Sequence, residues 1–387
     1  MGSFDVFVRY AHVDRERVLT LRDALVAQGL LVWFDDREIE TFDSISAAIE
    51  QGLASSKVLL AFFSQAYPAR RACQWELTAP IVAAQRVGRD PRERVLVVNP
   101  EDGAAHIEPV ELCDALFATA PMLSDAAGHA LLAKRVAEHA TGLDGMLGEL
   151  GVTTRPLWLG RRPVGANRFV GRLRDMWAVH SALTAGQVGL IAGAHSGDPA
   201  VKVAGMGGVG KSLLTVEYAL RFGAAYPGGV FWLRAEGRDG GRDALRSQTR
   251  DADRDVQLHG FATTLEIRTD DVEPGEVIGA LGAELDRRGL SFLWIVDGLP
   301  AGLSASEREA WYAPGRFGRT LMTTRSREYR SVGLQIDLGV LTSDEGYELL
   351  LKHRRPDGEA EEMAARGVVE DLMGKQRKWR RAEWWRI

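Results

Sequence analysis

One segment near the middle of the chain restricts its possible fold more than any other, and it spans Gly205–Ser212 with the sequence GMGGVGKS. It fits the pattern G-x-x-x-x-G-K-[ST], in which backbone amides and the start of a helix surround phosphate oxygens. The apolar run Val201–Ala204 precedes it, and apolar side chains follow at helical spacing as far as Arg221. The sequence therefore predicts a strand, a phosphate-binding loop and a helix, with a bound nucleoside triphosphate. A glycine-rich turn with a chance Lys-Ser pair is the alternative.

The pattern assigns a role to each of its defined positions. Lys211 would reach the terminal phosphates of ATP or ADP, and the Ser212 hydroxyl would hold Mg²⁺. Glycine suits the positions where the backbone closes on phosphate oxygens. The glycines of the segment are Gly205, Gly207, Gly208 and Gly210.

The composition limits the remaining possibilities. With 387 residues, of which 45% are hydrophobic and 26% charged, the chain fits two or three ordinary globular domains. Its net charge of -5 gives no signal for nucleic acid or a membrane surface, so we predict neither as a partner. The two cysteines, Cys73 and Cys113, lack metal-ligand spacing and fit a reducing compartment. Because the N-terminus does not resemble a signal peptide and no apolar run approaches about 20 residues, we expect a cytoplasmic protein.

Short apolar runs alternate with amphipathic stretches from Asp5 to about Ala140, which predicts a parallel sheet covered by helices. Between the first two runs, residues 14–28 carry apolar side chains on one helical face, with Asp14 as a candidate N-cap. In such folds, ligands bind beyond the carboxyl ends of the strands. The predicted strands are Asp5–Val8, Leu30–Phe34, Val58–Phe63, Val95–Val98 and Leu116–Ala118.

Residues 141–166 are rich in Gly, Arg and Pro, which predicts a linker between domains. We expect a second α/β domain over residues 167–356 and an atypical tail over residues 357–387. The predicted strands of the second domain are Val201–Ala204, Val230–Leu233, Phe292–Val296, Thr320–Thr323 and Leu334–Leu338.

Four stretches of the first 140 residues together resemble a Toll/interleukin-receptor (TIR) domain. They are residues 4–10 (FDVFVRY), residues 33–39 (WFDDREI) with the following Asp43–Ile45, residues 64–67 (SQAY) and residues 73–77 (CQWEL). The resemblance implies a flavodoxin-like fold with a parallel sheet over residues 1–140. The last of these stretches matches the helix that carries the catalytic glutamate of the family.

The resemblance also implies an activity, because enzymatic TIR domains cleave NAD at the bond between nicotinamide and ribose. Breaking that bond builds positive charge on the sugar, which a nearby carboxylate stabilises. Glu76 is thereby assigned as the catalytic residue. The implied contacts to NAD are Tyr10, Trp33, Phe34, Asp43 and Ser44.

Other interpretations of the first domain stay open. Without the resemblance, Glu76 would be an exposed helix residue, and Trp33 and Phe34 would be core residues at a strand end. The chain also departs from the family, with Ala72 where active relatives often have tryptophan and Ala11 where plant relatives often have arginine. These departures favour the alternative of a TIR adaptor that binds other TIR domains without catalysis.

The second domain resembles the STAND class of signalling NTPases, which includes the NB-ARC proteins. Residues 169–172 (FVGR) resemble the segment that lies against the nucleotide base in that class, so Val170 and Arg172 are implied contacts. Asp297 ends a predicted buried strand, where a carboxylate can order Mg²⁺. Residues 320–325 (TLMTTR) resemble the sensor strand, which makes Arg325 a reporter of the terminal phosphate; a surface salt bridge is the alternative.

The combined expectation is a nucleotide-gated signalling protein. Many STAND proteins have a second acidic residue where this chain has Gly298, so we expect weak or no ATP hydrolysis, although an ATP-hydrolysing machine is a further alternative. Nucleotide exchange at Lys211 would control self-association through both domains, and thereby NAD cleavage at Glu76. The resemblance implies a role in bacterial antiphage defence.

The C-terminal tail lacks the winged-helix segment and sensor repeats that STAND proteins usually carry. Residues 375–387 mix basic and tryptophan residues, a composition that could touch an anionic surface or that could belong to a truncated end without a role. We therefore expect the trigger to be sensed by another protein, or the sensor to have been lost.

Overall fold

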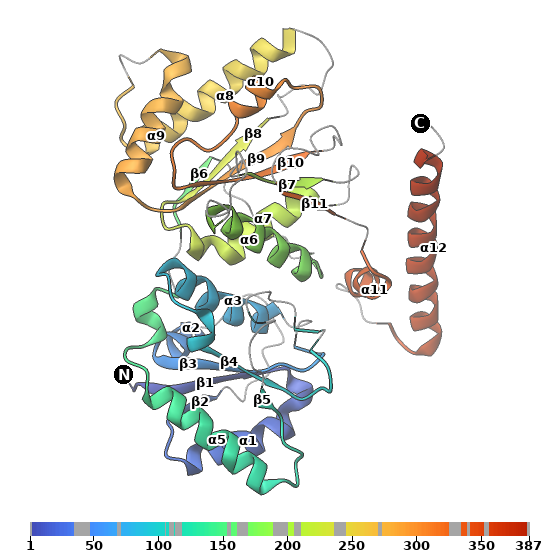
Figure 1. Cartoon of the computed structure of the whole chain (residues 1–387). Coiled ribbons are helices and arrows are strands. Elements are labelled where there is room, and N and C mark those ends of the chain that lie inside the picture. Colours follow the sequence, from blue (N-terminus) through green and yellow to red (C-terminus); the bar gives the residue numbers. More distant parts are fainter. Residues whose placement is uncertain are drawn as a thin grey trace. The chain divides into compact units, whose positions relative to one another are not determined.

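Figure 1 shows the computed structural model of the chain, which consists of two compact units. One contains residues 1–157 with the short segments 221–229 and 290–292, and the other contains the rest. The structure describes residues 2–34, 47–67, 71–104, 106–107, 112, 118–152, 156–160, 169–188, 200–204, 210–235, 245–269, 273–324, 334–338, 341–351 and 356–384. Each unit is described by itself.

The first unit is built on a five-stranded sheet with the order β2-β1-β3-β4-β5, and all of its strand pairs are parallel. This is the strand order of flavodoxin-like folds, which confirms the predicted fold class. The order reverses between β1 and β3, so the usual ligand crevice lies outside their carboxyl ends. The strands are β1 (Phe4–Tyr10), β2 (Val32–Phe34), β3 (Ser56–Phe62), β4 (Val95–Asn99) and β5 (Ala118–Thr119).

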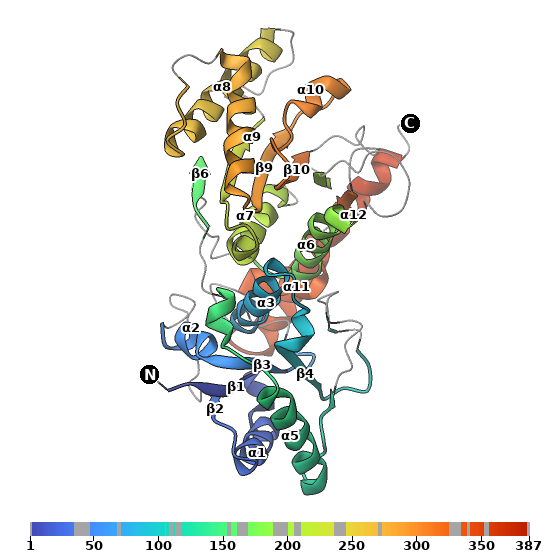
Figure 2. The same ribbon diagram turned by 60° about the vertical axis from the view of Figure 1, so that its left-hand side comes forward.

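Helices cover both faces of this sheet (Figures 1 and 2). On one face α1 (Arg15–Ala27) and α5 (Ala126–Thr141) pack on Val6 and Val8 of β1. On the other face lie α2 (Ala47–Ala54) and α3 (Arg71–Arg86). Because side chains alternate along a strand, Phe7 and Arg9 point to the face opposite Val6 and Val8. Four 3-10 helices belong to the described part of this unit: η1 (His12–Asp14), η2 (Pro91–Glu93), η3 (Leu147–Leu150) and η5 (Gly223–Ala225).

A buried arginine joins separate segments of the first unit. Arg94 lies directly before β4 and is 2% exposed. Its guanidinium donates hydrogen bonds to the carbonyl oxygens of Lys57, Asp144 and Gly145, at 3.1, 2.6 and 3.0 Å. Arg94 therefore holds the start of β3 and the chain after α5 against the start of β4.

Replacing Arg94 with Met is expected to lower the free energy of unfolding of this unit by about 3 kcal/mol, because three backbone carbonyl groups lose a buried, charged donor. Chemical unfolding of the full chain, followed by tryptophan fluorescence, measures the loss. The matched control is Arg92→Met, because Arg92 pairs with Asp90 on the surface, where it is 48% exposed. A shift in the Arg94 variant no larger than in the control would contradict the prediction.

The second unit is built on a six-stranded sheet with the order β11-β7-β10-β9-β8-β6. Its strands are β6 (Trp158–Gly160), β7 (Ala200–Ala204), β8 (Val230–Arg234), β9 (Phe292–Leu299), β10 (Gly318–Thr324) and β11 (Leu334–Asp337). The registers of β7 with β10 and β11, and of β8 with β6 and β9, are all parallel, which confirms the second predicted α/β domain. The edge strand β6 lies within residues 141–166, which the sequence predicts to be a linker. The sequence does not predict this strand, because three residues are too few to show a periodicity.

Helices also cover both faces of the second sheet. In Figures 1 and 2, α6 and α7 lie on one face and α8 and α9 on the other. The helices are α6 (Leu173–Val188), α7 (Lys211–Phe222), α8 (Leu245–Thr264), α9 (Val277–Arg288), α10 (Ala305–Glu309), α11 (Ser343–Leu351) and α12 (Glu359–Trp384), with the 3-10 turn η6 (Pro274–Glu276). Trp294 of β9 lies at the centre of the core, where its indole donates to the Trp311 carbonyl at 3.0 Å.

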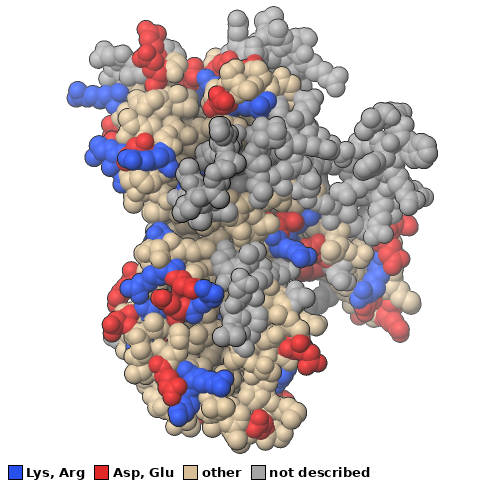
Figure 3. Space-filling view, in the orientation of Figure 1, with Lys and Arg blue, Asp and Glu red and all other residues tan. Residues whose placement is uncertain are grey.

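Charged side chains of both signs are mixed on the visible face of the molecule (Figure 3). Among the described residues of that face, no broad area carries a single sign. Over the whole part of the chain that the structure describes, no helix is both long and apolar enough to span a bilayer.

Candidate functional site

The predicted catalytic glutamate is buried beside the end of β1. Glu76 lies in the second turn of α3, and its side chain is 0% exposed. Its Oε2 atom lies 2.8 Å from Nε of Arg9, whose side chain is 13% exposed. Arg9 is the penultimate residue of β1, so the pair lies near the carboxyl end of this strand. Glu76 is thus a buried, ion-paired carboxylate rather than an exposed helix residue.

The aromatic residues predicted to surround NAD divide between the two faces of the sheet. Trp33 stacks on Phe7, with ring centroids 4.3 Å apart and planes 7° apart, on the same face as Arg9. A Cβ atom at Gly52 would lie 2.4 Å from the Trp33 ring, so glycine in α2 allows the close approach of the indole. Tyr10 and Phe34 stack on each other at 5.1 Å and pack on the core of the opposite face.

The structure therefore places Trp33 on the side of the sheet that carries Glu76, and it does not place Tyr10 and Phe34 there. Two further predicted contacts, Asp43 and Ser44, lie outside the described residues. Alternation along β1 separates Tyr10 from Arg9, which motif spacing alone does not indicate.

A second buried polar contact lies where the order of the strands reverses. The Ser64 hydroxyl, two residues after β3, donates a hydrogen bond to Oδ2 of Asp14, which follows β1. Burial raises the pKa of Asp14, against the opposing effects of the Ser64 hydrogen bond and the Arg17 charge. Asp14 does precede α1 as its N-cap residue, but its side chain accepts from Ser64 and not from the helix. The contact joins the loops that follow β1 and β3.

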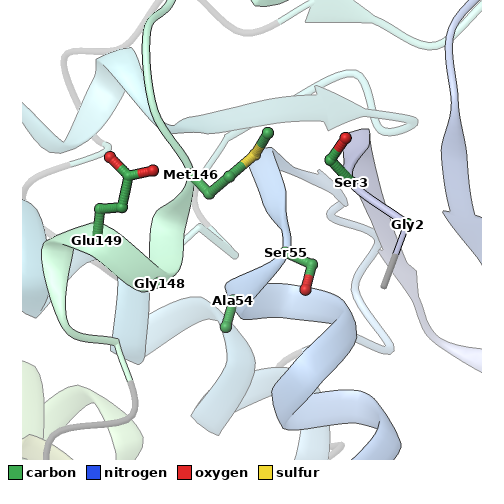
Figure 4. A pocket seen from close by; sticks show the side chains of 7 residues that line it. All are labelled: Gly2, Ser3, Ala54, Ser55, Met146, Gly148 and Glu149. Atoms are coloured by element: carbon green, nitrogen blue, oxygen red, sulfur yellow. The ribbon is translucent and has the colours of Figure 1, made fainter.

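A shallow pocket lies at the opposite end of the strands of this sheet (Figure 4). It has a volume of about 260 Å³ and is lined in part by Ser3, Ser55 and Glu149. Ser3 and Ser55 directly precede β1 and β3, so the pocket lies at the amino ends of these strands. Because Arg9 and Glu76 lie near the carboxyl end of β1, the pocket is separate from that pair.

The second candidate site lies at the start of α7. Gly210 has a φ of +94°, a conformation that favours glycine, and Lys211 begins the helix with 7% exposure. The Ser212 hydroxyl donates to Oδ1 of Asp297 in β9 at 2.7 Å. The structure therefore brings together the two residues predicted to hold Mg²⁺. Gly205, Gly207, Gly208 and Arg325 lie outside the described residues.

The sequence did not assign a role to Thr323, which orients the Asp297 carboxylate. The Thr323 hydroxyl donates to Oδ1 of Asp297 at 2.7 Å and accepts from the backbone N–H of Gly298 at 2.8 Å. This contact arises because β10, which carries Thr323, lies beside β9 in the sheet. A hydroxyl and a carboxylate that meet next to a helix N-terminus fit Mg²⁺ with phosphate, since this ion prefers hard oxygen ligands.

The segment predicted to contact the base is joined to α11. Phe169 and Val170 are buried, and the backbone N–H of Arg172 donates to Oε1 of Glu345 at 2.9 Å. The Arg172 guanidinium donates to Oδ2 of Asp175 at 3.2 Å. Burial raises the pKa of Asp175, while the Arg172 charge opposes the rise. The position of residues 169–172 is therefore tied to the first turns of α6 and α11.

His180 of α6 is buried against α7, where its Nδ1 lies 3.1 Å from the Tyr218 hydroxyl. Burial lowers its pKa from 6.5 to about 3, so the folded protein keeps the ring neutral. Below pH 6.5 the unfolded chain binds a proton that the folded chain does not, and the free energy of unfolding therefore falls as the pH falls.

Between pH 7.5 and pH 5, this difference is expected to lower the free energy of unfolding by about 2 kcal/mol. His180→Gln should remove that part of the pH dependence, because the amide does not titrate. Unfolding curves at both pH values measure the effect, and His12→Gln, which changes an exposed imidazole, should keep the wild-type dependence. An unchanged pH dependence in the His180 variant would show that this residue is not responsible.

Comparisons with known proteins agree with the geometry of the first unit. Residues 6–122 match the family model described as TIR domain. The NAD(+) hydrolase TcpA of Theionarchaea archaeon (strain DG-70-1) is 38% identical over 72 residues, which cover 17% of this chain. The match spans only 22% of that relative's own length. Residues 6–122 therefore match a TIR domain model, and a relative of part of the chain is named as an NAD hydrolase.

Two solved structures are similar to parts of the chain at low identity. The TIR domains of the activated Roq1 resistosome share 20% identity with a TM-score of 0.24, covering 37% of this chain and 86% of that one. A STAND protein with a tetratricopeptide repeat sensor from Pyrococcus horikoshii shares 19% identity with a TM-score of 0.34, covering 55% of this chain and 28% of that one.

Proposed function

We propose that the TIR domain hydrolyses NAD at the bond between nicotinamide and ribose, and that ATP or ADP at the second unit controls the assembly of the active form. The observation that carries the proposal is Glu76, a buried carboxylate near the carboxyl end of a central strand in a TIR domain. Parallel α/β folds bind ligands at the carboxyl ends of their strands.

The chemistry requires a carboxylate that stabilises positive charge. As the bond between ribose and nicotinamide breaks, its electron pair leaves with the nicotinamide, and positive charge develops on the ribose. A carboxylate stabilises such a charge most strongly in a site from which water is excluded. Water then adds to the sugar, which gives ADP-ribose and releases a proton. Glu76 is the proposed catalytic residue, and Trp33 is the predicted NAD contact on its side of the sheet.

The second unit is proposed to bind nucleotide as a switch. Lys211 would contact the terminal phosphates, while Ser212 and Asp297 would hold Mg²⁺, which neutralises phosphate charge when bound. Gly298 follows Asp297 and offers no second carboxylate to activate water. The site therefore suits slow hydrolysis and a long-lived bound nucleotide, as a switch needs.

The direct test is to incubate the purified full chain with NAD in the presence of ADP, ATP or no added nucleotide, and to measure the nicotinamide released. We expect release that depends on the nucleotide and that is absent from the Glu76→Ala variant. Equal release from both proteins would refute the catalytic assignment. Analysis of the nucleotide retained through purification tests the switch, since retained ADP indicates a resting state.

A non-catalytic TIR scaffold is the second candidate function, and one observation favours it. Glu76 is fully buried in its pair with Arg9, so the described arrangement does not expose the carboxylate to a ligand. Oligomers that depend on the TIR domain, with no NAD turnover under any nucleotide, would support the scaffold.

The wider setting is part of the same proposal. Self-association through both units, a separate protein that senses the trigger, a cytoplasmic location and a role in antiphage defence all follow from the resemblance to TIR and STAND signalling proteins. Measuring the molecular mass of the protein in solution with ADP and with ATP tests the proposed self-association.

A further inference from the structure

The ion pair between Arg9 and Glu76 links two elements that are distant in the sequence. Arg9 belongs to β1 and Glu76 to α3, and the Nε–Oε2 distance is 2.8 Å. The glutamate is 0% exposed and the arginine 13% exposed, so water screens the pair poorly. Separating the two charges of such a pair is costly unless new partners compensate for the lost attraction. Glu76 therefore separates from Arg9 readily only when both charges find new partners.

A substrate that carries both charges meets this requirement. NAD has a cationic nicotinamide on one ribose and an anionic diphosphate on the other side of that ribose. Arginine binds phosphate through several charge-assisted hydrogen bonds. Because part of its side chain is accessible and Glu76 is not, Arg9 would meet an incoming ligand first.

We propose that Arg9 is a specificity-determining residue that binds the substrate's diphosphate and releases Glu76 toward the ribose. The inference rests on the proposed NAD cleavage. The pair exchanges partners when NAD binds: the guanidinium moves to the diphosphate, and the carboxylate turns to the developing positive charge. A ligand that supplies only the cation, such as nicotinamide riboside, gives Arg9 no new partner.

The test compares NAD with nicotinamide riboside as substrates of the full chain. We expect the wild-type protein to cleave NAD with a kcat/KM about 100-fold above that for nicotinamide riboside. In Arg9→Gln, the value for NAD should fall about 100-fold, mainly through KM, while that for nicotinamide riboside changes less than about threefold. Arg9→Lys keeps the charge and should restore part of the preference.

A matched control separates this role from a general loss of positive charge. Lys57→Gln removes a cation from β3 that pairs with Asp5 at 3.2 Å, near the amino end of β1. It should leave both substrates unaffected, and the unfolding midpoints of all variants show whether they fold.

Each other result overturns the proposal. An equal fall for both substrates in Arg9→Gln would mean that Arg9 only supports the fold or the position of Glu76. A rise for both would mean that the pair is an inhibitory lock. If the wild-type protein cleaves neither substrate, the proposed function has failed. Calorimetric measurement of NAD binding then tests the proposed role of Arg9 separately. Loss of NAD affinity in Arg9→Gln would support the diphosphate contact, and equal affinity would refute it.

Discussion

Glu76→Gln is expected to lower nicotinamide release from NAD by about 1,000-fold, because a neutral amide stabilises little positive charge in the transition state. The substitution preserves the size of the side chain and removes the negative charge that pairs with Arg9. The loss should therefore fall on kcat, with a much smaller change in KM. Steady-state kinetics with separated nicotinamide measure both.

The matched control is Glu138→Gln, which changes an exposed glutamate of α5 that pairs with Lys134. It should retain wild-type turnover. Unfolding midpoints should be compared as well, because a folded but inactive Glu76 variant is the informative result. Turnover of Glu76→Gln within about threefold of wild type would exclude this carboxylate as the source of the rate and would favour the scaffold.

Most of the architecture could be predicted from the sequence, because strands buried on both faces appear as continuous apolar runs. Residues 58–63 and 292–296 are such runs, and they became β3 and β9. β6 could not be predicted, since Trp158–Gly160 is short and stands in a Gly- and Pro-rich segment. Its place in the sheet depends on pairing with β8, which lies far along the chain.

The sites were predicted unevenly, for a physical reason. Lys211 and Ser212 belong to a local motif whose geometry is set by the turn from loop to helix, and Asp297 follows an apolar run. Thr323 and Arg9 make contacts between separate elements, which the spacing of residues along the sequence does not indicate. The aromatic residues show the converse case. Tyr10 and Phe34 match a motif, but the alternation of β1 directs Tyr10 away from the side of Arg9.

Lys211→Ala is expected to weaken the binding of both ATP and ADP by about 100-fold. Lys211 begins α7 and is 7% exposed, and its ammonium and the helix N-terminus would act on the same phosphates. Calorimetric titration of the purified full chain, after removal of retained nucleotide, measures the affinity. Arg287→Ala is the control, because Arg287 pairs with Glu284 on the exposed face of α9.

Repeating the titration with and without Mg²⁺ separates the contribution of the metal to nucleotide affinity from that of Lys211. Asp297→Asn should weaken binding only when Mg²⁺ is present, whereas Lys211→Ala should weaken it in both conditions. Thr323→Val should fall between wild type and Asp297→Asn, because it removes one donor that orients the carboxylate but keeps the charge. Wild-type affinity in Lys211→Ala would refute the nucleotide site. If instead that variant loses nucleotide binding and its NAD cleavage no longer responds to ATP, the two units act as switch and effector, since Lys211 and Glu76 belong to different units.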